Sequence, residues 1–192
     1  MSYDAQLLQK QRFVKTILRK IASKLSSFGV AFDEETERGL PCGLSKIIAS
    51  PEQESYRNKD EFSIWPGKDG KEKVVGFLSG SLKDPNTHCV PADEVFLSKE
   101  SHKLAAKSFQ HYINSVSPFG ICTHFDRPEG NWRRLIVRSN RLNQLMIIAV
   151  FHPKETTFAE VIEEKERLNA YFEPKTADLG IRSLYFQVRS SF

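Results

Sequence analysis

The sequence feature that most constrains the fold is a short, almost continuous apolar run. It reads Leu-Met-Ile-Ile-Ala-Val-Phe and ends at Phe151. Such a run is typical of a central strand that is buried on both faces of a sheet. We therefore expect Gln144 to Phe151 to form an inner strand.

Alternating apolar patterns predict further strands around this one. Their expected ranges are Tyr56–Trp65, Lys73–Ser79, Thr87–Val90, Gly120–His124, Trp132–Ser139 and Ile181–Val188. The first two flank residues 66–70, where one proline and two glycines favour a turn. These two strands are therefore predicted to form a hairpin.

Two helices are expected to pack on the sheet. The first covers residues 99–114, with Ser98 as its N-cap. Its candidate core residues are Leu104, Phe109 and Ile113. The second begins at Thr157, which forms a capping-box pattern with Glu160, and runs to about Phe172. The predicted fold class is α+β, a mostly antiparallel sheet with two packed helices plus an N-terminal basic amphipathic helix.

The N-terminal helix is predicted from Asp4 to Phe28. Its apolar residues recur at helical spacing and are Leu7, Val14, Leu18, Ile21, Leu25 and Phe28. Its cations are Lys10, Arg12, Lys15, Arg19, Lys20 and Lys24. They form either a solvated face or a face that contacts phosphates, since cations near phosphates release counterions. We expect residues 1–46 to form this helix and a connecting arm, and residues 47–192 to form the α+β domain.

Composition favours an ordinary globular protein. Apolar residues make up 40% and charged residues 27%, and the formal net charge is +4. The sequence has neither an apolar run of about 18 residues nor a signal peptide, so we expect an intracellular protein that binds no membrane. Cys42, Cys89 and Cys122 are widely spaced, which predicts free thiols and no metal site.

Arg57 and Lys59 place two cations in an aromatic strand pattern. The strand period of two puts both of them, with Glu61, on the face opposite Asp60. Two cations about 7 Å apart suit successive phosphates, with Glu61 either paired to them or hydrogen-bonded to a base edge. The alternative is an outer face held by salt bridges.

A second basic cluster contains only arginines. They are Arg127, Arg133, Arg134, Arg138 and Arg141, and Glu129 is the only acid among them. A guanidinium grips phosphate bidentately and stacks on bases, which suits a structured RNA loop. Trp132 is a candidate for stacking on a flipped base. The alternative is that Trp132 lies in the core.

His152 ends the predicted inner strand and is followed by Pro153 and Lys154. Its ring offers an extruded nucleotide a stacking plane and a hydrogen-bond donor, although a histidine in this position is also commonly a surface residue. The candidate RNA-binding residues are Arg57, Lys59, Trp132, Arg133, Arg134, Arg138, His152 and Lys154.

The sequence contains no motif of an enzyme centre. The glycine-rich turns that bind nucleotide cofactors, the phosphate-binding loop, the Gly-x-Ser-x-Gly nucleophile turn and the His-Glu-x-x-His zinc motif are all missing from it. We therefore assign no catalytic residue, cofactor site or metal site to this chain.

Four segments resemble the eukaryotic branch of the tRNA uracil-5-methyltransferases. They are Ile47–Pro51 running into Tyr56–Lys59, then Trp132–Ser139, Ala149–Lys154 and Ser183–Gln187. Their order and spacing are also similar to those of the family. The segment Tyr3–Leu7 resembles the family's first helix, and Tyr-Arg-Asn-Lys-Asp-Glu-Phe from Tyr56 resembles its Tyr-Arg-Asn-Lys-Cys-Glu-Phe strand.

The resemblance implies the RNA-binding region of an enzyme that uses S-adenosylmethionine to methylate a T-loop uridine of tRNA. In that family the region helps to hold the loop while the uridine is flipped, because a cysteine must reach carbon 6 of the base. By position, His152 resembles the histidine that helps to hold the unfolded loop. Arg57, Arg133 and Arg138 occupy matching motif positions. We expect a monomer whose partner is the tRNA T-loop.

Two departures limit what the resemblance implies. Asp60 stands where many relatives have cysteine, so we expect no iron–sulfur ligand there. The family's cofactor-binding fold, its Asp-Pro-Pro-Arg segment and its Ser-Cys-Asn-Pro nucleophile are expected beyond Gln187. We therefore expect the chain to bind RNA but to be inactive alone, with S-adenosylmethionine used only by the full-length enzyme.

Two main hypotheses follow. The first is the tRNA-binding region of a uracil-5-methyltransferase, and the alternative is a stand-alone RNA-binding protein or chaperone derived from that family. An independent enzyme of another type has little beyond chain length to support it. The expected location is the cytoplasm or nucleus, or the mitochondrion if an upstream targeting segment is missing.

Overall fold

The protein contains two compact units. The computed structural model describes residues 1–32, 39–81, 84, 86–122 and 130–190. The first unit is Met1–Pro51, with helix α1 (Tyr3–Ser26) and the arm that follows it, and the second unit is Glu52–Phe192. Residues 47–51 therefore fall in the first unit, although the sequence placed them in the α+β domain.

In the first unit, the arm returns along α1. The backbone N–H of Ser50 donates to the hydroxyl of Tyr3 at 2.7 Å, and Ala22 and Leu40 are the buried apolar residues. Helix α1 ends at Ser26 with Ser27 as its C-cap, two residues before the predicted end at Phe28, and Gly29 follows in a left-handed conformation (φ 83°). Part of the predicted apolar face remains uncovered within this unit, because Val14, Ile21 and Leu25 are 37–45% exposed.

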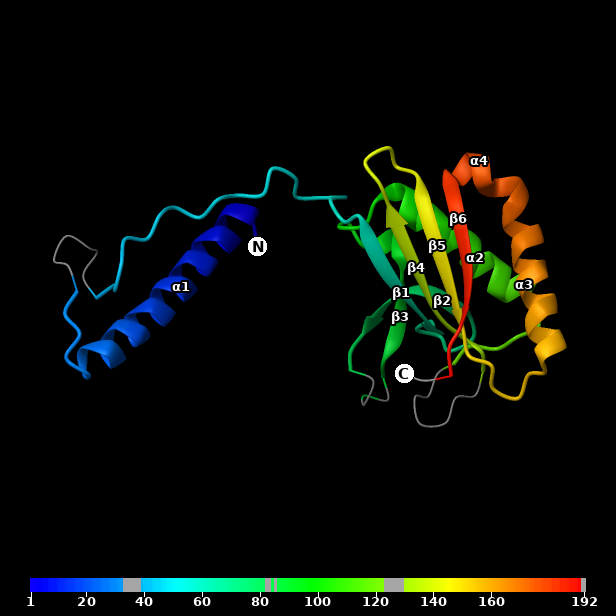
Figure 1. The fold of residues 1–192 in the computed structure, drawn as a ribbon, viewed down its shortest axis with the longest axis horizontal. Helices are drawn as coiled ribbons and strands as arrows, with labels where there is room; N and C mark the ends of the chain where they lie inside the picture. The colour runs from blue at the N-terminus through cyan, green and yellow to red at the C-terminus, as the bar shows by residue number, and fades with distance from the viewer. Residues whose placement is uncertain (33–38, 82–83, 85, 123–129, 191–192) are drawn as a thin grey trace. The chain divides into compact units, whose positions relative to one another are not determined.

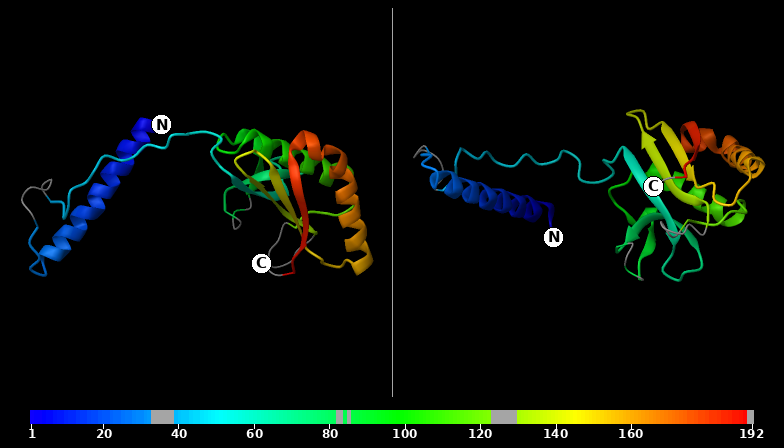
Figure 2. Two further views of the ribbon diagram at one scale, coloured as in Figure 1. Left: turned by 45° about the horizontal axis from the view of Figure 1, so that its top comes forward. Right: turned by 60° about the horizontal axis from the view of Figure 1, so that its bottom comes forward.

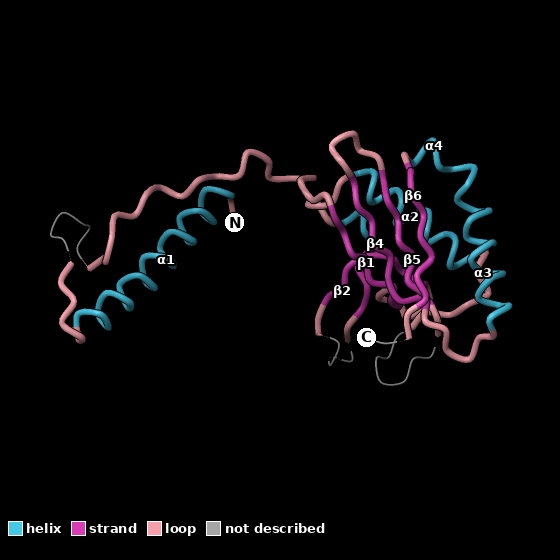
Figure 3. The backbone as a smooth tube through the Cα atoms, in the orientation of Figure 1, coloured by secondary structure: helices cyan, strands magenta, loops and turns pink. Residues whose placement is uncertain are grey.

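The second unit is built on a six-stranded sheet of order β3-β2-β1-β4-β5-β6 (Figure 3). The strands are β1 (Lys59–Pro66), β2 (Lys73–Ser79), β3 (His88–Pro91), β4 (Trp132–Ser139), β5 (Leu145–Phe151) and β6 (Ile181–Val188). Neighbouring strands are antiparallel except β5 and β6, which are parallel. The α+β prediction and the β1–β2 hairpin are confirmed.

One predicted strand is not a strand of this sheet. Within Gly120–His124, the described residues make only an isolated bridge, which joins Ile121 to Trp132. Residues 123 and 124 lie outside the described part of the chain. Gly130 is packed so closely on Gly120 and Ile121 that an added Cβ would lie 2.5 Å from the Ile121 oxygen. The segment is therefore held by this close backbone approach.

Helices α2 (Glu100–Ser115) and α3 (Phe158–Phe172) cover the same face of the sheet (Figures 1 and 2). The Phe109 ring of α2 packs 5.2 Å from Trp132 and 6.4 Å from Phe172 of α3, measured between ring centroids. The single-turn helix α4 (Thr176–Leu179) leads into β6. The core thus lies between the sheet and α2 and α3.

Strand β5 is buried mainly from this one side. Leu145, Ile147, Ala149 and Phe151 belong to the core. In the other row Val150 is buried, whereas Met146 and Ile148 are only half-buried. The prediction of a strand buried on both faces was therefore wrong in part. Its physical reason is that the described helices of this unit pack on a single face.

The ends of the two large helices were predicted with different success. The Thr157 capping box is confirmed, because Thr157 and Glu160 exchange backbone-to-side-chain hydrogen bonds. Ser98 was wrongly predicted as an N-cap, since the chain is still extended at Lys99 and α2 begins one residue later. Leu104 is 46% exposed, because it lies off the stripe of α2 that faces the core.

Candidate nucleic-acid interface

The sheet face opposite α2 and α3 brings together three of the predicted RNA-binding cations. The register places Lys59 of β1 opposite Arg138 of β4, and Ser63 of β1 opposite Arg134 of β4. We call this surface the open face. Its members are Lys59, Glu61, Arg134, Ile136, Arg138, Met146, Ile148 and Tyr185.

The open face is positive but partly self-paired. The Glu61 carboxylate binds both the Lys59 ammonium and Arg134 Nη1, the latter at 3.1 Å. Hydrogen bonding to Lys59 lowers the pKa of Glu61 below its usual value. Among the described residues, no carboxylate pairs with Arg138. Three cations around one carboxylate leave a net positive surface, as an RNA backbone requires.

An aromatic and aliphatic row crosses the same face. Glu61 lies opposite Ile136, Ile136 opposite Ile148, and Ile148 opposite Tyr185 on β6. The Tyr185 side chain is 53% exposed. Proteins commonly bind single-stranded RNA by stacking bases on aromatic rings and by pairing phosphates with cations, and this uncovered face offers both kinds of group.

Arg57 does not lie on the open face, contrary to the predicted alternation. It precedes the first residue of β1, and its Nε lies 3.1 Å from Asp60 Oδ1 on the helix-covered face. Its guanidinium carbon is 5.7 Å from the centre of the Phe77 ring. The strand period fails here because β1 starts at Lys59, so the buried carboxylate decides where Arg57 points.

Trp132 is a core residue. Its side chain is fully buried, its indole N–H donates to Ser117 Oγ at 2.9 Å, and its ring packs edge-on against Phe109 and Phe151. The proposed stacking on a flipped base is therefore corrected, because the ring offers no open face. Of the two interpretations left open by the sequence, the structure agrees with the core.

A second group of basic side chains gathers where β4 starts and β5 and β6 end, and we call it the basic end. Its members are Arg133, His152, Lys154 and Arg189. Arg133 is the extra residue of a β-bulge, since Trp132 pairs with Phe151 and Arg134 with Val150. Partial burial lowers the pKa of Arg133, and the positive charges of Arg134 and Arg189 also lower it.

The loop after β5 is held by Asn131, which is buried. Its side-chain amide donates to the backbone oxygens of His152 (2.9 Å) and Lys154 (3.2 Å). The backbone N–H of Lys154 in turn donates to His152 Nδ1 at 3.1 Å. Accepting this bond requires an unprotonated Nδ1, which leaves Nε2 as the ring nitrogen that can carry a proton. His152 thus keeps one ring N–H that can donate to a nucleotide.

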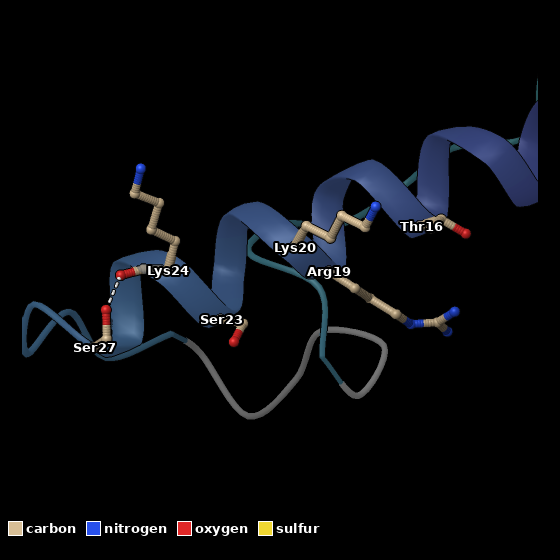
Figure 4. A pocket seen from close by; sticks show the side chains of 6 residues that line it. All are labelled: Thr16, Arg19, Lys20, Ser23, Lys24 and Ser27. Atoms are coloured by element: carbon tan, nitrogen blue, oxygen red, sulfur yellow. Dashed lines mark hydrogen bonds between the residues drawn. The ribbon is translucent and has the colours of Figure 1, made fainter.

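The first unit carries a separate basic surface on α1 (Figure 4). A shallow groove there is lined by Thr16, Arg19, Lys20, Ser23, Lys24 and Ser27. The hydroxyls of Thr16 and Ser27 donate to backbone oxygens within the helix. This lining of cations and hydroxyls fits both a solvated face and a phosphate-facing one, so both interpretations from the sequence stay open.

Two of the three cysteines, Cys89 and Cys122, are buried thiols. Burial raises the pKa of Cys89 to about 12, and burial also raises the pKa of Cys122. Both thiols are therefore protonated at neutral pH and are poor nucleophiles. Among the residues that the structure describes, no group of three His, Cys, Asp or Glu is placed to hold a metal ion, and no helix is long and apolar enough to span a membrane.

Besides the aliphatic members of the open face, the sequence candidates lacked one aromatic and one cationic residue of these surfaces, Tyr185 and Arg189. Tyr185 lies in a segment that was used only for the family resemblance, and Arg189 lies one residue after β6. The backbone N–H of Arg189 donates to the Phe151 oxygen, which brings Arg189 beside the end of β5. Because alternate residues of a strand point to opposite faces, the β6 sequence already places Tyr185 on the face opposite Leu184 and Phe186. Arg127 lies outside the described residues, and Arg141 lies in the turn between β4 and β5.

Comparison with known proteins agrees with the predicted resemblance. No family model matches the chain. It is 35% identical over 193 residues to tRNA (uracil-5-)-methyltransferase homolog B of Mus musculus, with 97% of this chain and 38% of that protein covered. The homolog B of Danio rerio is 36% identical over 189 residues, with the same shares covered. Homolog A of Homo sapiens is 34% identical over 196 residues, which cover 96% of this chain and 30% of the relative.

The chain therefore spans less than two fifths of the length of these curated relatives. Over almost all of its own length, it is homologous to one part of the tRNA (uracil-5-)-methyltransferase homologs A and B.

Proposed function

We propose that the chain binds tRNA through the open face and the basic end, and that it holds the T-loop for uracil-5-methylation. The observation that carries this proposal is the gathering of Lys59, Arg134 and Arg138 on a sheet face that the helices of the same unit leave uncovered. The sequence relationship to proteins named as tRNA methyltransferases supports tRNA as the nucleic acid.

Each group has a physical role in this proposal. Arg134 and Arg138 grip phosphates, since guanidinium groups bind phosphate bidentately. Phosphate replaces Glu61 as the partner of Arg134, which costs little because exposed ion pairs contribute about 0–1 kcal/mol. Tyr185 offers a stacking surface, and His152 Nε2–H donates to an unstacked nucleotide. The RNA is thus bound by its backbone and by exposed bases.

The chemical step is outside the role proposed for these residues. For the complete reaction, S-adenosylmethionine supplies the methyl group. A flipped uridine is needed there, because the target carbon is not accessible inside a stacked loop. In this proposal the chain binds RNA as a monomer, and its only contribution to the reaction is to hold the RNA.

A pair of double variants tests the interface. Arg134→Ala/Arg138→Ala removes two open-face cations, and Lys107→Ala/Lys165→Ala removes two exposed cations from α2 and α3 as a charge-matched control. In titrations of labelled tRNA at low salt, we expect the first variant to weaken the affinity about tenfold or more and the control to change it by less than about twofold. Equal losses in both variants would show non-specific attraction and contradict the proposal.

T-loop recognition is tested separately by competition. An isolated T-arm hairpin and an anticodon-arm hairpin of equal length are added to the complex with labelled tRNA. We expect the T-arm hairpin to displace the tRNA at a lower concentration. Equal competition would leave RNA binding in place but overturn the T-loop assignment.

A further inference from the structure

We propose that Asp60 and His102 are positioning residues, which hold the Arg57 guanidinium so that it binds an RNA phosphate at the start of β1. This inference rests on the proposed RNA-binding function and adds Arg57 to the three cations of the open face. It also assigns a role to a buried polar pair that the open face and the basic end do not use.

The three side chains form one connected group. Asp60 and His102 are both fully buried, and His102 Nδ1 lies 2.8 Å from Asp60 Oδ2. Arg57 Nε lies 3.1 Å from the other oxygen of the same carboxylate. One carboxylate of β1 is therefore hydrogen-bonded to a residue of α2 through Oδ2, and through Oδ1 it forms an ion pair, without a hydrogen bond, with the segment that leads into the strand.

Burial makes this arrangement rigid. A buried carboxylate without partners costs several kcal/mol, so Asp60 retains both of its neighbours. The Phe77 ring under the guanidinium restricts it further. The Arg57 backbone is also tied down, because its N–H donates to the Leu97 oxygen at 3.4 Å. An arginine held in this way loses little conformational entropy when it binds a ligand.

The Arg57 guanidinium still has N–H groups that can bind a ligand. The Arg57 side chain is 38% exposed, and the contact with Asp60 uses Nε. Among the described residues, the terminal Nη groups have no carboxylate partner. A guanidinium that faces a carboxylate with Nε in an ion pair leaves these groups for an acceptor with two oxygens, which is the chemistry of a phosphodiester.

The surroundings of Arg57 favour an anion. Lys59 follows two residues later and lies opposite Arg138. Lys99, at the start of α2, donates to Ser139 Oγ at 3.2 Å, and the Ser139 N–H donates to the Asn58 oxygen. Four cations thus lie around the point where β1 begins and β4 ends. Arg57 itself lies off the open face, so a phosphate that it binds would extend the binding surface beyond the start of β1.

A double-mutant cycle on the full 192-residue chain separates positioning from general stabilisation. We measure tRNA affinity and urea stability for Arg57→Ala, for Asp60→Asn and for the double variant. We expect each single change to weaken binding about fivefold and the double change to weaken it no further, because Asp60 acts only through Arg57. Asp60→Asn should also lower the salt slope of binding by about 0.7–0.9, which is one phosphate contact.

Two outcomes would overturn the inference. One is an Asp60→Asn loss that is just as large in the Arg57→Ala background. The other is an Arg57→Ala variant with unchanged affinity while Arg134→Ala/Arg138→Ala loses affinity, since this leaves RNA binding intact and removes only the role of Arg57. Failure of every variant and of the unmodified chain to respond to tRNA would instead reject the proposed function.

A second pair of variants tests the inference even if the Asp60→Asn variant does not fold. His102→Gln retains a side-chain N–H that can reach Asp60, whereas His102→Leu does not. We expect His102→Gln to bind tRNA within about twofold of the unmodified chain, and His102→Leu to weaken binding as Arg57→Ala does. Equal affinities of the folded Gln and Leu variants would contradict positioning by His102.

Discussion

Two neighbouring acids of β1, Asp60 and Glu61, lie on opposite faces of the sheet and differ in burial and in partners. Asp60 points to the covered face, is fully buried and is held by Arg57 and His102. Glu61 points to the open face, has a side chain that is 39% exposed, and pairs with Lys59 and Arg134. Breaking a buried ion pair costs about 3–5 kcal/mol, whereas an exposed pair contributes about 0–1 kcal/mol. The covered face therefore fixes its charges, and the open face can exchange its partners for phosphates.

The largest expected effect of a single change lies on the covered face. Phe109 is fully buried between Trp132 and Phe172. We expect Phe109→Ala to lower the free energy of unfolding by about 3–5 kcal/mol, because it leaves a cavity between α2, α3 and the sheet. Urea unfolding followed by circular dichroism measures this. The open-face control Arg138→Ala should have a free energy of unfolding within about 0.5 kcal/mol of that of the unmodified chain. Similar losses of stability in the two variants would contradict the proposed difference between the faces.

A smaller effect is expected from the second buried carboxylate. The Tyr112 hydroxyl donates to Glu164 Oε1 at 2.6 Å, and Arg167 binds the other carboxylate oxygen. We expect Tyr112→Phe to cost about 1–3 kcal/mol, because a buried carboxylate loses one of its donors. A cost near zero in the same unfolding assay would show that the carboxylate is not confined in this way.

The same tyrosine predicts a response to alkaline pH. Burial, and then the hydrogen bond to Glu164, raise the pKa of Tyr112 above its ordinary value of 10.0. A raised pKa in the folded state means that this stabilisation is complete below pH 10.0 and is lost as the pH rises above it. We expect Tyr112→Phe to lose less stability than the unmodified chain between about pH 8 and pH 11. Equal losses of stability in the variant and the unmodified chain would show that groups other than Tyr112 cause the alkaline response.

The smallest expected effect is on the open face. Glu61→Gln removes a negative charge and frees Lys59 and Arg134 from their shared partner. We expect tRNA affinity at low salt to rise about threefold, which is within the energy of an exposed ion pair. Titration of labelled tRNA measures the change. A weaker affinity would indicate that the Glu61 carboxylate itself accepts a hydrogen bond from RNA.

Local sequence patterns were sufficient for much of the fold. The ranges of β4 and β6 and the Thr157 capping box were predicted correctly, because alternation and capping depend on residues close together in the chain. The direction of Arg57 was not predictable in this way. It depends on the Asp60–His102 pair, which joins residues 42 positions apart, and on a strand that begins two residues after Arg57.

The candidate interface was predicted in part for the same reason. Lys59, Arg134 and Arg138 were expected separately, and only the β1–β4 register shows that they share a face. Trp132 and Arg133 are neighbours in one motif, but a β-bulge and the packing of α2 and α3 separate the buried ring from the basic end. Arg189 joins the basic end through the parallel pairing of β5 and β6, which the sequence did not indicate.

The salt dependence of tRNA binding tests the central claim most directly. The slope of log affinity against log salt counts the phosphate contacts, at about 0.7–0.9 per contact. We expect Arg134→Ala/Arg138→Ala to reduce this slope by about 1.4–1.8 while the Lys107→Ala/Lys165→Ala control leaves it unchanged. A slope that is the same in the open-face variant and the unmodified chain would contradict RNA binding on the open face.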